Sequence, residues 1–190
     1  ASTTSNQMDP NKLAALRRKY ADAKGGDIFD PAFAAVASQV FIDPEKRKWP
    51  FAGIATLLSA PALVPDLSGA TARAFDDIDV ALVGVPMDLG VTNRAGARLG
   101  PRAVRAVERI GPYEHVLKIA PMGVLKVADI GDVPMASRFS LDQCIADIES
   151  FFDKIRASNV VPLAVGGDHS ITYPILKALG RDRPVGMVHI

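Results

Sequence analysis

Apolar residues form a nearly continuous run at residues 78–85, where most side chains are aliphatic and several are β-branched. A run of this length and composition is typical of a parallel strand that is covered on both faces. Apolar runs at residues 124–130, 160–165 and 185–190 predict three more strands. The pattern therefore indicates a buried sheet in the part of the chain that follows residue 77.

The segments between these strands have the three- and four-residue spacing of apolar positions that predicts helices. One helix begins at Pro101 and extends to Ile110, and a second follows the N-cap candidate Ser140. A third, shorter helix covers residues 170–179. Strands that alternate with helices in this way predict right-handed βαβ units and a parallel sheet, in which functional residues lie in the loops after the strands.

The N-terminal part of the chain has a weaker pattern. Residues 12–23 and 31–40 each predict a short helix, whereas residues 49–65 are interrupted by prolines and a glycine and predict an irregular segment. We therefore divide the chain into a partly helical N-terminal extension at residues 1–48, which we expect to make oligomer contacts, and an α/β part at residues 49–190.

Composition adds mainly exclusions. The 22 lysines and arginines nearly balance the 21 aspartates and glutamates, and this net charge of +1 gives no reason to expect nucleic acid or a membrane as a partner. No apolar run approaches the roughly 20 residues that span a bilayer, and no signal peptide is expected at residues 1–11. The one cysteine, Cys144, excludes an internal disulfide and a multi-cysteine zinc site. We expect a cytoplasmic protein.

The turn at residues 166–170 is the sharpest local feature. Two glycines allow the backbone to turn tightly as it leaves a strand, and Asp168 and His169 follow directly. Neutral imidazole is the commonest metal ligand, and a neighbouring carboxylate can orient it. Alternatively, Asp168 caps the next helix and His169 packs nearby. The local pattern alone leaves both interpretations open.

A glycine-rich loop with two arginines follows the first core strand at residues 86–100. It could place an anion at the N-terminus of the next helix, or it could be a structural loop whose arginines bridge to neighbours. Its glycine spacing fits neither a phosphate-binding loop nor a dinucleotide-binding turn. A nucleotide-binding domain is therefore disfavoured.

Together, these motifs resemble the arginase/agmatinase (ureohydrolase) family. The resemblance covers about residues 49–190, and residues 51–56 are more similar to the guanidinobutyrase, guanidinopropionase and guanidine hydrolase branch than to arginase itself. The stretches that carry it are Val83–Arg105, Val127–Val133, Pro162–Ile171 and Val185–Ile190.

This resemblance implies a three-layer α/β/α fold with a mostly parallel sheet, of which the chain holds the N-terminal half. It also implies two divalent metal ions, Mn²⁺ or Ni²⁺, that activate a shared water for attack on a guanidino carbon. His169 would bind one metal, and Asp168 would support it without touching the metal. The loop residues Asn93, Arg94 and Arg98 would border the substrate mouth or a subunit contact.

The implied reaction is hydrolysis of a small guanidino compound, such as guanidinobutanoate, guanidinopropanoate, agmatine, guanidine or a biguanide, to urea and an amine. We expect a homo-oligomer, either a trimer or a hexamer. The alternative is a non-catalytic subunit that stabilises an active paralogue in a hetero-oligomer.

The family's next motif, Asp-Ala-His-x-Asp, would come after Ile190. We therefore expect one metal ligand, no activity and an exposed apolar sheet edge in this chain alone. His189 is expected to be a hydrogen-bonded core residue of the last strand, and His115 to be structural or solvent-facing.

Overall fold

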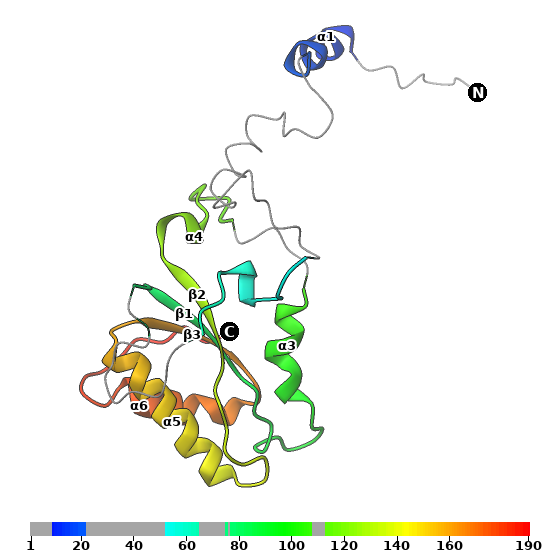
Figure 1. The fold of residues 1–190 in the computed structure, drawn as a ribbon. Coiled ribbons are helices and arrows are strands. Elements are labelled where there is room, and N and C mark those ends of the chain that lie inside the picture. The colour runs from blue at the N-terminus through cyan, green and yellow to red at the C-terminus, as the bar shows by residue number, and fades with distance from the viewer. Residues whose placement is uncertain (1–8, 22–51, 65–74, 76, 108–112) are drawn as a thin grey trace.

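The computed structural model describes residues 9–21, 52–64, 75, 77–107 and 113–190 (Figure 1). The helix predicted at residues 31–40 lies outside these ranges. Helix α1 (Pro10–Lys19) begins earlier than predicted, because Asp9 caps it by accepting a hydrogen bond from the Asn11 amide at 2.9 Å. It ends earlier too, at Lys19, and it buries no residue.

Three parallel strands form the sheet, in the order β2-β1-β3. Strand β1 (Val80–Val85) is central, and its Val80 lies opposite Val127 of β2 (Val127–Asp132) and Val161 of β3 (Val161–Gly166). The predicted parallel sheet is therefore confirmed. Strand β2 starts later than expected because the short helix α4 (Pro121–Val124) occupies the residues before it.

Helices cover the two faces of this sheet (Figure 1). Helix α5 (Leu141–Ala157) packs against α6 (Thr172–Leu179) on one face, and α3 (Gly100–Arg105) lies on the other face beside the 3-10 turn η2 (Leu57–Ser59).

Alternate β1 residues enter two separate cores. Ala81, Val83 and Val85 pack in the cluster that contains the apolar face of α5, whereas Leu82 packs with Leu57 and Ala60. The period of two along a strand thus creates the three layers that were expected.

Two predicted helices differ from the observed ones. Helix α3 ends at Arg105 rather than continuing to Ile110, which lies outside the described residues, and Val107 is exposed. The helix predicted from residue 170 begins with the 3-10 turn η4 (His169–Ile171), and the regular α6 starts at Thr172. By contrast, α5 begins where predicted, because the Ser140 hydroxyl accepts a hydrogen bond from the Gln143 amide at 3.3 Å.

The prediction of a buried strand at residues 185–190 is wrong. These residues have no strand structure and are exposed, and they do not pair with any strand of the described sheet. The core position predicted for His189 is therefore wrong too. Its ring stacks on that of His169, with centroids 4.9 Å apart and planes 5° apart.

Strand β3 pairs only with β1 among the described strands, and its Val161 side chain is 64% exposed. The expected exposed apolar edge is present at this strand. Among the described residues, no helix is both long enough and apolar enough to cross a membrane.

Candidate functional site

The loops that follow β1 and β3 meet at the carboxyl ends of the two strands. The Met87 carbonyl accepts a hydrogen bond from the Asp168 amide at 2.9 Å. The Gly90 amide donates to Asp168 Oδ2 at 2.7 Å. These contacts hold the turn that carries His169 against the loop at residues 86–100, so the two sequence motifs form one structural unit.

Close backbone packing requires glycine in this turn. Gly167 has a φ of +54°, and a Cβ atom there would lie 2.5 Å from the Val85 carbonyl oxygen and 2.7 Å from that of Met87. A larger residue would push the turn away from β1. The glycine pair therefore fixes the position at which Asp168 and His169 leave β3.

Asp168 is 8% exposed and acts as the cap of the next turn. Its Oδ1 atom accepts hydrogen bonds from the Ser170 amide at 2.9 Å and from the Ser170 hydroxyl. The capping interpretation is thus confirmed for this carboxylate. No hydrogen bond joins Asp168 to the His169 ring within the described structure, so Asp168 supports His169 through the backbone of the turn.

His169 is exposed rather than packed, which contradicts the structural interpretation of its side chain. The ring of His189 lies over one face of it. Stacking occupies the face of an imidazole and not the in-plane nitrogen lone pairs that bind metals. A ring nitrogen of His169 can therefore still bind a metal ion at this edge of the sheet.

A second buried carboxylate holds the other end of the loop. Asp88, whose side chain is 4% exposed, accepts hydrogen bonds from Arg98 Nε at 2.8 Å and from the Gly96 amide at 2.9 Å. The loop is therefore held at Gly90 by Asp168 and near Gly96 by Asp88. Between these anchors, the segment 91–95 presents an exposed tip.

The three predicted mouth residues have different environments. Asn93 and Arg94 lie on the exposed tip. Arg98 is half exposed, but its guanidinium is engaged by Asp88. The structure thus brings Asn93 and Arg94 to the surface of the loop and gives Arg98 a structural contact within it.

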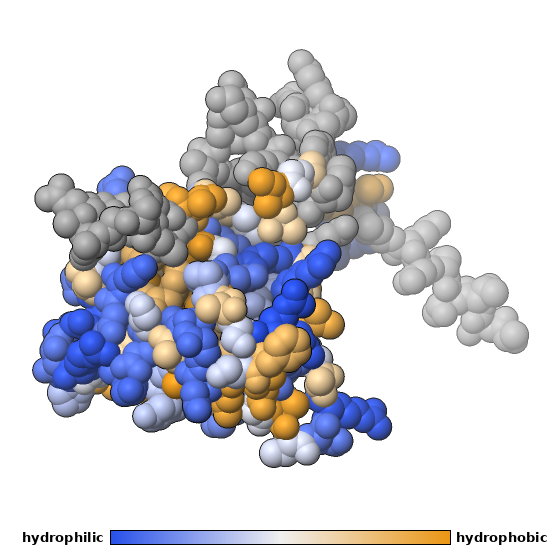
Figure 2. Space-filling view, turned by 60° about the horizontal axis from the view of Figure 1, so that its bottom comes forward, coloured by the Kyte–Doolittle hydropathy of each residue, from blue (hydrophilic) through white to orange (hydrophobic). Residues whose placement is uncertain are grey.

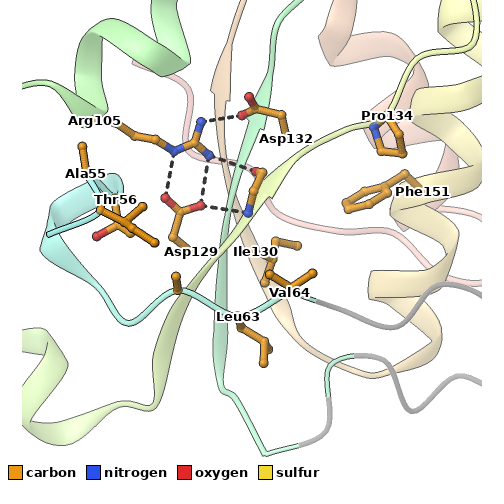
Figure 3. A pocket seen from close by; sticks show the side chains of 13 residues that line it. Ala55, Thr56, Leu63, Val64, Arg105, Asp129, Ile130, Asp132, Pro134 and Phe151 are labelled. Atoms are coloured by element: carbon orange, nitrogen blue, oxygen red, sulfur yellow. Dashed lines mark hydrogen bonds and ion pairs between the residues drawn. The ribbon is translucent and has the colours of Figure 1, made fainter.

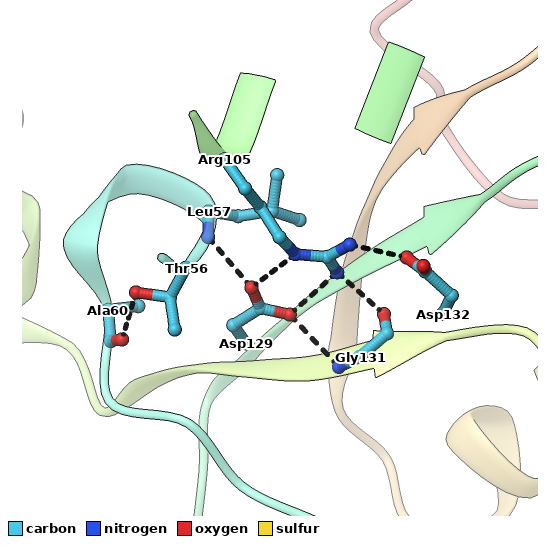
Figure 4. A network of polar contacts seen from close by, with 7 residues as sticks. All are labelled: Thr56, Leu57, Ala60, Arg105, Asp129, Gly131 and Asp132. Atoms are coloured by element: carbon cyan, nitrogen blue, oxygen red, sulfur yellow. Dashed lines mark hydrogen bonds and ion pairs between the residues drawn. The ribbon is translucent and has the colours of Figure 1, made fainter. Parts of the chain in front are cut away.

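A network around Arg105 was not predicted (Figure 4). Its guanidinium donates to both oxygens of Asp129, at 2.8 and 3.0 Å, to Asp132 at 2.6 Å and to the Gly131 carbonyl at 3.0 Å. Asp129 also accepts hydrogen bonds from the Leu57 amide at 2.7 Å and the Gly131 amide at 2.9 Å. The network joins α3, β2 and residues 52–64.

These contacts shift both ionisation equilibria. The hydrogen bond to Asp129 raises the pKa of Arg105 further above its ordinary value, although burial opposes it. Burial alone would raise the pKa of Asp129, but the hydrogen bonds from Arg105, Leu57 and Gly131 together lower it. The pair is therefore fully charged at neutral pH.

This network forms one side of a cavity of about 360 Å³ (Figure 3). The other walls are mostly apolar and include Leu63, Ile130 and Phe151. The sequence signal for the network is the Asp-x-Gly-Asp pattern at the end of β2, which lies in a stretch that carries the family resemblance.

The family model described as the arginase family matches residues 78–190. The chain belongs to the arginase family. The matched residues include both anchored loops, His169, and the Arg105, Asp129 and Asp132 side chains of the network, whereas Leu57 lies before the matched range.

Among curated relatives, the chain is 44% identical over 140 residues to guanidinopropionase of Pseudomonas aeruginosa, covering 73% of this chain and 41% of the relative. It is 41% identical over 142 residues to guanidinobutyrase of the same organism, covering 74% and 42%. These names confirm the predicted branch of guanidino-compound hydrolases within the arginase family.

A crystal structure of a hypothetical agmatinase from Burkholderia thailandensis superposes with a TM-score of 0.60 and 30% identity. The alignment covers 76% of this chain and 44% of that one. This arginase-family chain therefore spans less than half the length of the relatives that it matches.

The described residues do not by themselves fit the two-metal centre implied for an arginase-family protein. Within the described ranges, no group of three or more His, Cys, Asp and Glu side chains could hold a metal ion. Asp88, Asp129 and Asp168 are already used by backbone amides and arginines. His169 and His189 are both exposed and stack on each other, and two imidazoles alone do not make a centre for two metals.

Proposed function

We infer that the complete protein hydrolyses the guanidino group of a small guanidino compound, releasing urea and an amine. The observation that carries this proposal is the placement of His169. It lies exposed after the carboxyl end of β3, on a turn that is held by Met87 and Gly90 of the loop after β1, in a chain of the arginase family. Ligands bind in such positions in parallel sheets.

The proposal assigns His169 as one ligand of a centre of two divalent cations, either Mn²⁺ or Ni²⁺. Other ligands must come from residues outside the described ranges. The described residues next to His169 position it. Gly167 sets the path of the turn, and Asp168 holds it against Gly90.

The surroundings of the site complete the proposal. Asn93 and Arg94 on the loop tip border the substrate mouth or a subunit contact, and residues 1–48 contribute to a trimeric or hexameric assembly in the cytoplasm. The substrate class is supported by the names of the relatives, guanidinopropionase and guanidinobutyrase.

The test compares His169→Ala with His115→Ala in the complete protein. His115 is an exposed histidine beside Tyr113, with ring centroids 5.1 Å apart, and it is a matched control for loss of an imidazole. We expect His169→Ala to lose urea release and part of the bound Mn or Ni, and the control to keep both. If metal content and urea release both persist in His169→Ala, the assignment is wrong.

The unsubstituted protein is assayed on a series of guanidino compounds with each metal in turn. Urea release identifies the substrate. A protein that releases no urea from any compound but raises the activity of a paralogue would instead be the non-catalytic subunit.

A further inference from the structure

A second cavity, of about 210 Å³, lies between the loop after β1 and the loop after β2. Both loops are at the lower end of the view in Figure 1, where the carboxyl ends of the strands are found. With this end turned forward, Figure 2 shows charged and polar side chains interspersed with apolar ones. The cavity therefore lies on the side of the sheet where ligands of such folds bind.

Its lining combines an apolar surface with two arginines. Met87, Val133 and Met135 provide apolar walls, of which Met87 and Val133 are almost fully buried. The arginines are Arg98 and Arg138. A pocket that is mostly apolar and has a few charged groups is suited to a small amphipathic molecule.

Only one of these charges is uncompensated. Arg98 is neutralised by the Asp88 carboxylate, which is occupied further by the Gly96 amide. Arg138 is exposed and has no acidic partner in the part of the chain that the structure describes. The lining therefore carries a net positive charge located on Arg138, whose planar guanidinium can bind a carboxylate through two hydrogen bonds.

We propose that this cavity binds a short-chain carboxylate, with the carboxylate on Arg138 and the aliphatic chain against Met87 and Val133. Met87 lines the cavity and also contacts the turn that carries His169, because its carbonyl accepts a hydrogen bond from the Asp168 amide at 2.9 Å. The carboxylate has two possible sources. It is either the tail of a guanidino acid, an assignment that rests on the proposed function, or a separate small carboxylate.

Binding is tested without turnover by ligand-observed NMR of butanoate with the complete protein. We expect the unsubstituted protein to bind butanoate but not butylammonium. In Arg138→Gln, the affinity for butanoate should fall about tenfold or more, which is the effect of losing about one charged hydrogen bond. Arg183→Gln removes the same charge from an exposed residue outside the cavity lining and should bind butanoate normally. Equal butanoate affinity in Arg138→Gln and the unsubstituted protein overturns the proposal.

Kinetics then separates the two sources. If the carboxylate is a substrate tail, Arg138→Gln raises the KM for guanidinobutanoate by about tenfold and leaves the KM for guanidine unchanged. In that case butanoate also competes with the substrate. If it is a separate ligand, butanoate changes turnover without competing. A protein that binds butanoate through Arg138 but hydrolyses no guanidino compound contradicts the proposed function and supports the cavity.

Discussion

Arg105 and Asp129 form a two-pronged ion pair in which both oxygens of one buried carboxylate accept hydrogen bonds from one guanidinium, at 2.8 and 3.0 Å. The Asp129 side chain is 3% exposed, and it also holds the Leu57 amide. Three segments that are distant in the sequence therefore depend on one charge pair. A buried pair of this kind contributes little net energy, but loss of one partner leaves an uncompensated buried charge.

Arg105→Met should lower the free energy of unfolding by about 3 kcal/mol, because methionine retains the aliphatic part of the side chain but leaves Asp129 buried and unpaired. Urea denaturation of the complete protein measures this loss. Arg102→Met is the matched control, since Arg102 is an exposed residue of the same helix. An equal effect of the two substitutions would show that Arg105 contributes only helix packing.

The same pair predicts an acid-sensitive component of stability. The pKa of Asp129 is lowered in the folded state, so the folded protein releases this proton more readily than the unfolded chain. The stabilisation is complete above the unfolded pKa of about 4, and it is lost as the pH falls through the folded pKa. Asp129→Asn should therefore differ most from the unsubstituted protein at neutral pH. Denaturation midpoints between about pH 7 and pH 3 test this, and a constant difference would contradict it.

The close approach of Gly167 to Val85 predicts a steric defect in Gly167→Ala. The new Cβ would meet the Val85 carbonyl oxygen at 2.5 Å in addition to the cost of a positive φ. Gly53→Ala is the control, because Gly53 has a φ of +86° but open space around it. We expect the control to cost about 1 kcal/mol and Gly167→Ala to cost more. Thermal unfolding gives both values, and equal losses would show that the turn can move to relieve the clash.

Strand and helix positions in the core were predictable because local patterns determine them. The apolar run of β1 and the cap at Ser140 depend on residues that are close in the sequence, and both are found in the structure. The segment at residues 185–190 has an equally apolar pattern but forms no strand. Hydrophobicity favours a buried strand, but pairing with a neighbour depends on tertiary contacts, and the sequence does not state which strands are adjacent.

The candidate site was predictable in part for a related reason. His169 and Asp168 follow a glycine pair directly, so their delivery to the sheet edge could be derived from local chemistry. Arg105 and Asp129 are 24 positions apart, and their pairing requires the register of α3 against β2. The contact between Gly90 and Asp168 spans 78 positions. Long-range pairs of this kind follow from the fold and have no local sequence signal.

Asp168→Ala should loosen the connection between the two loops. It removes the acceptor of the Gly90 and Ser170 amides, and leaving these donors without a partner costs about 1–3 kcal/mol. We expect faster amide hydrogen exchange in residues 87–92 and in the turn that carries His169. Ser140→Ala, which removes the exposed cap of α5, should affect only that helix. Unchanged exchange at Gly90 in Asp168→Ala would show that another contact holds the loop.

Cys144 offers a probe of the cavity that contains Arg138, because it lines that cavity and is the single cysteine of the chain. Its side chain is 2% exposed, its thiol donates to the Ser137 carbonyl at 3.1 Å, and burial raises its pKa. Since the thiolate is the reactive form, alkylation near pH 8 should be slow in the folded protein and fast in denaturant. Mass spectrometry follows the reaction over time. Rapid alkylation of the native protein would mean that the cavity wall opens readily, and further slowing by butanoate would place that ligand against Cys144.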